Sequence, residues 1–255
     1  MRISALHRYM VAAVVLFGLM SWSAHAGEVS VAVAANFSAP MERIAALFQQ
    51  DSGHTLKVSF GSSGKFYAQI KAGAPFDVFL SADEKNPQLL EDGGLAAKGS
   101  RFVYALGKLV LWSAKPGYVD AKGAVLGKGD YGKIAYADPR LAPYGVAAQE
   151  ALQKMKLWDK VQGKLVTGES IGQTYQFAAS GNAELAFIAL SQVTKDGKVS
   201  EGSYWLVPAE MYSPIRQSAV QLTEAKDKAA AQAFLKFLQS EKAKAVMRSF
   251  GYELP

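Results

Sequence analysis

The chain has 255 residues, half of them hydrophobic, and no cysteine, which excludes disulfides, thiolate zinc sites and cysteine nucleophiles. A chain of this length can bury enough apolar surface to fold without cross-links. The formal net charge of +6 is modest and its Lys and Arg residues are scattered, so the clustered basic surface of a nucleic-acid-binding protein is also excluded.

The first 26 residues have the pattern of a secretory signal peptide. Arg2 and Arg8 form a basic start, residues 10–20 are an apolar run too short to cross a bilayer, and Ala24 and Ala26 are small residues at a cleavage site. We expect cleavage after Ala26 and a periplasmic mature chain, whose formal net charge falls from +6 to +4 because both arginines are removed. A retained membrane anchor is the alternative.

Short apolar strands alternate with amphipathic helices along the mature chain. Such alternation indicates parallel βαβ units in a doubly wound sheet. The predicted strands are 29–35, 55–60, 78–81, 108–112, 133–137, 165–167 and 185–190, and the predicted helices are 40–50, 65–71, 146–155, 172–180 and a long region at 227–250 with a break near Ser240.

The mature length exceeds what one such sheet needs, so we predict two α/β lobes. No linker of biased composition separates them, so the chain is expected to cross between the lobes through strands, near Gly107 and again near Pro214. Two crossings make a hinge. The first lobe then comprises residues 27–107 and 215–255, and the second lobe comprises residues 108–214.

Four junctions between a predicted strand and the following helix are short and polar, with Glu169 as their only charged residue. In open α/β sheets ligands bind beyond the carboxyl ends of the strands, where these junctions lie. A helix N-terminus offers unpaired N–H groups and a positive dipole end, so several of them can hold an anion with neutral donors. One such junction is usually an ordinary helix cap, but two in each predicted lobe favour an anion site. The junctions are 34–38, 61–64, 142–145 and 169–172.

Other functions are less compatible with these residues. A phosphate loop at 61–65 would need Gly at position 59 and Ser or Thr at position 66, where the chain has Ser59 and Phe66. A serine hydrolase or phosphatase using Ser63 would have only His54 as its base once the signal peptide is removed, and His54 is expected in a solvated turn. We therefore expect a binding protein, with no catalytic residue and no metal coordinated by the protein.

At the four junctions the sequence resembles the periplasmic molybdate-binding proteins of ABC transporters. The similarity extends over essentially the whole mature chain, and its most specific motif is GAPFDVFLSAD at residues 73–83. The other landmarks are AANF at 34–37, FGSSG at 60–64, ADP at 137–139, PYG at 143–145 and FGY at 250–252.

The resemblance implies a two-lobed α/β fold of type II periplasmic-binding topology, each lobe a mixed or mostly parallel sheet flanked by helices, with the ligand in the cleft between the lobes. It implies that molybdate or tungstate is held by hydrogen bonds alone, without cofactor or counter-ion, and is delivered to the membrane permease of an ABC importer. Sulfate or another tetrahedral oxyanion is the alternative ligand. We expect a monomer that binds no nucleic acid.

Carried over residue by residue, the resemblance implies five ligand-binding positions. Asn36 and Ser63 would donate from the first lobe through side chain and backbone N–H, and Ala35 would add a backbone N–H. Tyr144 and Ile171 would donate from the second lobe through their backbone N–H groups, so their side chains are expected to matter less.

The sequence departs from many members of the family at two positions. Many members have Ser where this chain has Asn36, and a ligand Tyr where it has Ala189. The chain resembles the branch of the family in which an extra Asn N–H replaces the lost phenol.

Overall fold

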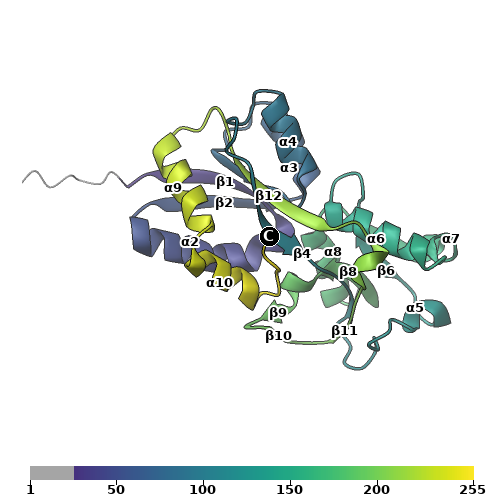
Figure 1. The fold of residues 1–255 in the computed structure, drawn as a ribbon. Coiled ribbons are helices and arrows are strands. Elements are labelled where there is room, and N and C mark those ends of the chain that lie inside the picture. The colour runs from purple at the N-terminus through teal and green to yellow at the C-terminus, as the bar shows by residue number, and fades with distance from the viewer. Residues whose placement is uncertain (1–25) are drawn as a thin grey trace, which may run out of the picture.

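The computed structural model describes residues 26–255. The predicted signal peptide lies outside these residues, apart from Ala26. The described chain forms two five-stranded sheets with helices on their faces, so the predicted two-lobed α/β architecture is confirmed (Figure 1). A separate two-stranded antiparallel ribbon is formed by β9 (Thr194–Lys195) and β10 (Lys198–Val199), within the chain segment of the second lobe.

The first lobe is built on a sheet with the strand order β2-β1-β3-β12-β4. Strand β1 pairs in parallel with β2 and β3, whereas β12 runs antiparallel to β3 and β4. The valines of β1 are fully buried because helices cover both faces of this sheet, as is usual for parallel strands. The strands are β1 (Glu28–Ala34), β2 (Thr55–Gly61), β3 (Val78–Leu80), β4 (Phe102–Gly107) and β12 (Ile215–Gln221).

Two groups of helices cover this first sheet. One group packs through a core that includes Met41, Phe48, Phe234 and Met247, and the other packs through a smaller core around Phe79. The first group is α2 (Ser38–Ser52), α9 (Lys228–Leu238) and α10 (Glu241–Ser249), and the second group is α3 (Ser63–Lys71) and α4 (Lys85–Asp92). The predicted break near Ser240 is confirmed, because the Ser240 hydroxyl caps α10 by accepting the N–H of Ala243.

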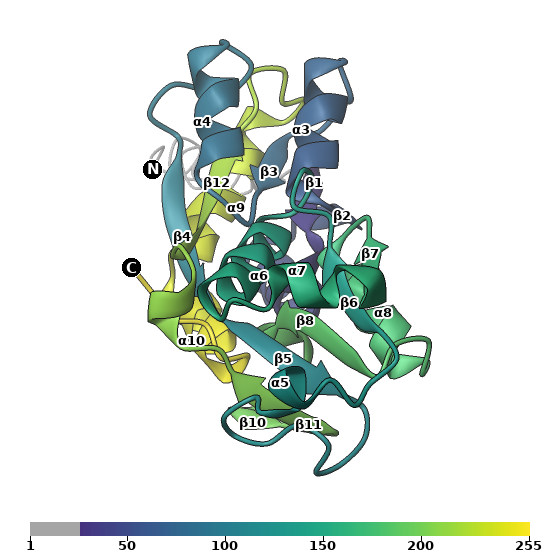
Figure 2. The same ribbon diagram turned by 90° about the vertical axis from the view of Figure 1, so that its right-hand side faces the viewer.

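The second lobe has the strand order β11-β5-β8-β6-β7. Helix α6 packs on one face through small residues such as Ala147 and Ala151, and α8 packs on the other face through Ala178 (Figure 2). The strands are β5 (Leu109–Ser113), β6 (Ile134–Ala137), β7 (Leu165–Gly168), β8 (Leu185–Ala189) and β11 (Ser203–Leu206), and the helices are α5 (Val125–Lys128), α6 (Pro143–Lys154), α7 (Trp158–Val161) and α8 (Ile171–Ala179).

The chain passes between the two sheets twice. It leaves the first sheet at the end of β4 and, after the single residue Lys108, enters the second sheet with β5, and it returns between β11 and β12. Strands therefore change sheets at Gly107 and before Ile215. Because parallel strands of both lobes end at the same side, the helices that follow them start close to the boundary between the lobes.

Candidate functional site

A small cavity lies between the two lobes where helices from both of them begin. It includes all five predicted ligand residues, and every residue that lines it is uncharged. The space open to a water-sized sphere is about 10 Å³, within about 190 Å³ of empty space that includes the opening to solvent. We call it the junction cavity, and its lining residues are Ala34, Ala35, Asn36, Gly61, Ser62, Ser63, Ala82, Ala142, Pro143, Tyr144 and Ile171.

Backbone N–H groups at helix starts give this cavity its chemistry. Ser63 is the first residue of α3, Ile171 is the first residue of α8, and Tyr144 follows Pro143 at the start of α6. N–H groups in a first turn have no acceptor within their own helix, and proline has no N–H, so Tyr144 supplies the first donor of α6. The structure thus brings donors of both lobes together, while their role as ligands remains a prediction.

The Ser63 side chain is held in place for donation. Its hydroxyl oxygen accepts the backbone N–H of Ala82 at 3.0 Å, and the residue is only 1% exposed. An accepted hydrogen bond polarises the hydroxyl group and strengthens its own donation. The hydroxyl proton of Ser63 can therefore be donated to a ligand in the cavity.

The Asn36 side chain is oriented differently from what the sequence predicts. Its amide nitrogen Nδ2 donates to Gln217 Oε1 and to the Tyr252 hydroxyl, both at 2.8 Å. Its oxygen Oδ1 is buried and has no hydrogen-bond partner among residues 26–255. In this orientation the amide protons are used within the protein, so the side chain would have to turn before it could donate into the cavity as predicted.

A buried group of polar side chains lies behind Asn36. Gln217 Nε2 donates to the Tyr144 hydroxyl at 3.2 Å, and Tyr104 donates to Gln217 Oε1 at 3.0 Å. Burial raises the pKa of Tyr252 to about 12 and raises the pKa values of Tyr104 and Tyr144 as well, so these phenols stay protonated and neutral. The Tyr144 side chain therefore has a structural role that the sequence did not indicate.

The glycine at the first crossing makes room for this group. A Cβ at Gly107 would lie 2.1 Å from the Tyr144 hydroxyl oxygen and 2.7 Å from Gln217 Nε2. Side chains of both lobes can thus meet directly at the hinge because residue 107 has none.

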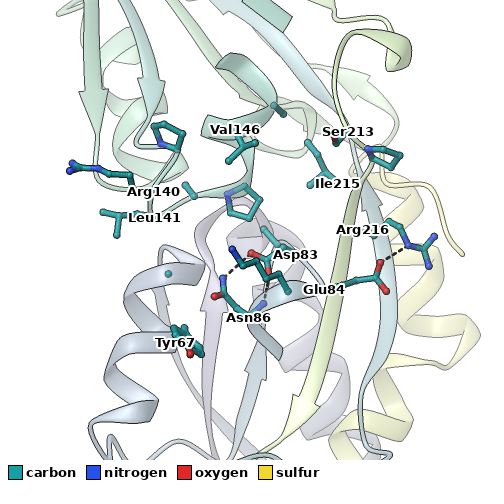
Figure 3. Close-up of a pocket in the computed structure, with 18 of the residues that line it drawn as sticks. Tyr67, Asp83, Glu84, Asn86, Arg140, Leu141, Val146, Ser213, Ile215 and Arg216 are labelled. Carbon is teal, nitrogen blue, oxygen red and sulfur yellow. Dashed lines mark hydrogen bonds and ion pairs between the residues drawn. The ribbon is translucent and has the colours of Figure 1, made fainter. Parts of the chain in front are cut away.

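A second, wider space opens beside the junction cavity (Figure 3). Its empty space, including its opening to solvent, is about 1280 Å³, but the carboxylates of Asp83 and Glu84 line it. Its arginines are already paired, Arg216 with Glu84 at 2.7 Å and Arg140 with Asp138 at 2.6 Å. The carboxylate of Glu150 lines it too, and Lys85 is its one cation without an ion pair in the described chain, so we assign the anion site to the uncharged junction cavity.

Within residues 26–255, no three His, Asp or Glu side chains are grouped in a way that could hold a metal ion. The helices described there include none that is both long and apolar enough to span a membrane.

The fold and the cavity together define a class of protein. Two α/β lobes joined by two crossings, with a small uncharged cavity between them, are the architecture of a two-lobed solute-binding protein. The chain belongs to the family of bacterial extracellular solute-binding proteins, which it matches over residues 29–253.

The chain is also similar to proteins that are named as molybdate-binding proteins, the family that its sequence motifs resemble. The chain is 55% identical to the molybdate-binding protein ModA of Azotobacter vinelandii, over 93% of this chain and 94% of that protein. It is 53% identical to ModA of Rhodobacter capsulatus, over 90% and 89% of the two chains. The solved periplasmic molybdate-binding protein of Azotobacter vinelandii superposes with a TM-score of 0.87 at 44% identity, covering 89% of this chain and 99% of that one. The resemblance indicated by the sequence is confirmed.

Proposed function

We propose that this protein captures molybdate or tungstate in the junction cavity and delivers it, in the periplasm, to the permease of an ABC importer. The observation that supports this most directly is the convergence of helix-start N–H groups of both lobes on one uncharged cavity. Relatives named as molybdate-binding proteins at 55% and 53% identity support the same ligand. The periplasmic location rests on those relatives and on the signal-peptide pattern.

Neutral donors select for a fully deprotonated ion. A hydrogen bond to a charged group contributes about 1.5–3 kcal/mol, so about six such bonds can offset much of the cost of desolvating a dianion. Monohydrogen phosphate carries a proton that needs a strong acceptor, and the side chains that line the cavity include no carboxylate, only neutral oxygens such as Asn36 Oδ1. Molybdate, tungstate and sulfate lack that proton, and sulfate is smaller, so the size of the closed cavity decides among them.

A catalytic role for Ser63 is not part of the proposal. His54 is the histidine of the described chain, and its Nδ1 accepts the N–H of Gly27 at 2.9 Å. His54 lies just before β2 and Ser63 lies just after β2. Because β2 is a strand of seven residues, it separates the two side chains by more than about 20 Å. The serine therefore has no histidine base within reach.

Calorimetric titration of the mature protein tests the ligand. We expect tight one-to-one binding of molybdate and tungstate, with little heat from sulfate or phosphate. Ser63→Ala should weaken molybdate binding by about 1.5–3 kcal/mol, roughly ten- to a hundredfold, because it removes a donor to a charged group. Equal affinity for sulfate would contradict the ligand assignment, and wild-type affinity in the variant would place the ion elsewhere.

A further inference from the structure

Ser62 lines the junction cavity but was not among the residues predicted from the sequence. It is the N-cap residue of α3, a position where a serine hydroxyl normally accepts an N–H from the first turn. Here the Ser62 side chain makes no capping bond. The residue is only 3% exposed, and no described residue forms a hydrogen bond with its hydroxyl oxygen.

A buried hydroxyl without a partner lowers stability, and folded proteins retain few of them. Three hydroxyl groups of residues 26–255 are in this state, those of Ser62, Thr194 and Ser218. Of these three, Ser62 alone lines the junction cavity, where it lies beside Ser63, and it also borders a neighbouring surface pocket next to Lys65. The cost of leaving this hydroxyl unpaired is explained if its partner is a ligand.

We propose that the Ser62 hydroxyl is a further donor to the oxyanion, next to the hydroxyl of Ser63. This inference rests on the proposed function. The two serines would act differently, because Ser63 is already fixed by the N–H of Ala82. The Ser62 hydroxyl is free to rotate about its C–O bond, so its proton can follow the position of an anion oxygen, whereas backbone N–H groups have fixed directions.

The test compares Ser62→Ala with Ser218→Ala, which removes a buried, unpaired hydroxyl on β12 outside the junction cavity. Molybdate affinity is measured by calorimetry, and the melting temperature is measured without molybdate. Ser62→Ala should lower the affinity by roughly ten- to a hundredfold. The same change should leave the melting temperature equal or higher, because it removes an unpaired buried hydroxyl. Ser218→Ala should keep the wild-type affinity.

The outcomes separate this inference from the proposed function. Wild-type molybdate affinity in Ser62→Ala would overturn the role of Ser62 and leave the proposed function intact. A lower melting temperature without molybdate would also overturn it, because a structural hydroxyl would then explain the loss of affinity. Failure of the wild-type protein to bind either molybdate or tungstate would overturn the proposed function itself.

Discussion

The backbone of Tyr144 faces the proposed ligand site, whereas its side chain faces the hinge. Its backbone N–H lies at the start of α6 beside the junction cavity, while its phenol is buried against Gln217 of the first lobe. The sequence indicates only the backbone function, because a helix start is a local feature. The phenol contact depends on β12 lying next to β4, which no local pattern reveals.

We expect Tyr144→Phe to lower the thermal stability more than the molybdate affinity. Loss of the phenol leaves Gln217 Nε2 buried without its acceptor, which costs about 1–3 kcal/mol of unfolding free energy. Thermal unfolding and calorimetry of the same sample check this. Tyr204→Phe is the matched control, since Tyr204 is 40% exposed on β11. An affinity loss as large as that expected for Ser63→Ala would instead place the phenol in the ligand site.

The hydrogen-bond partners of the Asn36 side chain could not be predicted from the sequence. The four junctions were found because each combines a strand ending, small polar residues and a helix start within a few positions. Gln217 and Tyr252 bond to Asn36 from 181 and 216 residues away. The orientation of the Asn36 amide depends on both partners, so it cannot be predicted from the sequence alone, and donation by its side chain to a ligand stays a prediction.

Among the elements, helix α3 contacts the second lobe directly at its N-terminus. The N–H of Gly64 in its first turn donates to the Leu141 carbonyl of the second lobe at 2.9 Å. A Cβ at position 64 would lie 3.1 Å from both the Cα and the carbonyl oxygen of Leu141, which is tighter than an ordinary contact. The glycine thus allows the N-terminus of α3 to approach the backbone of the other lobe.

Gly64→Ala should therefore weaken ligand binding without unfolding the first lobe. Crowding against a backbone costs about 1–3 kcal/mol, so molybdate affinity should fall by roughly five- to a hundredfold. Alanine is the better helix former, so stability without molybdate should change little. Gly127→Ala in α5 is the control, because a Cβ there meets nothing within 4 Å. Calorimetry giving equal affinities for both variants would show that this contact does not affect binding.

Some of the elements missed by the sequence have weak patterns of their own. Helix α4 buries only Pro87 and Leu90, so it has no apolar stripe to reveal it. Strands β9 and β10 have two residues each, too few for an alternating pattern. Longer elements such as α2, which buries Met41, Ile44 and Phe48 at helical spacing, were predicted within a few residues of their bounds.

At the scale of the whole molecule, three ion pairs at the surface also join the lobes, one of them between Lys108 and Glu253 at 2.6 Å. Lys65 pairs with Glu169 beside the junction cavity, and Arg43 of α2 pairs with Asp196 in the turn of the β9–β10 ribbon. Pairs this exposed contribute about 0–1 kcal/mol each and weaken with salt. A ligand that forms charge-assisted hydrogen bonds with both lobes is therefore expected to contribute more than these pairs to holding the lobes together.

Binding should therefore draw the lobes together. Donors of the first lobe at Asn36 and Ser63 and donors of the second lobe at Tyr144 and Ile171 meet at one cavity, so each lobe alone offers only part of the set. A ligand shifts a conformational equilibrium only by its difference in affinity for the two states, and an anion that needs both sets binds the closed state more tightly. Small-angle X-ray scattering should show a smaller radius of gyration on saturation with molybdate, at low and at high salt alike. Curves that do not change on saturation would contradict closure, and a change abolished by salt would assign it to the ion pairs.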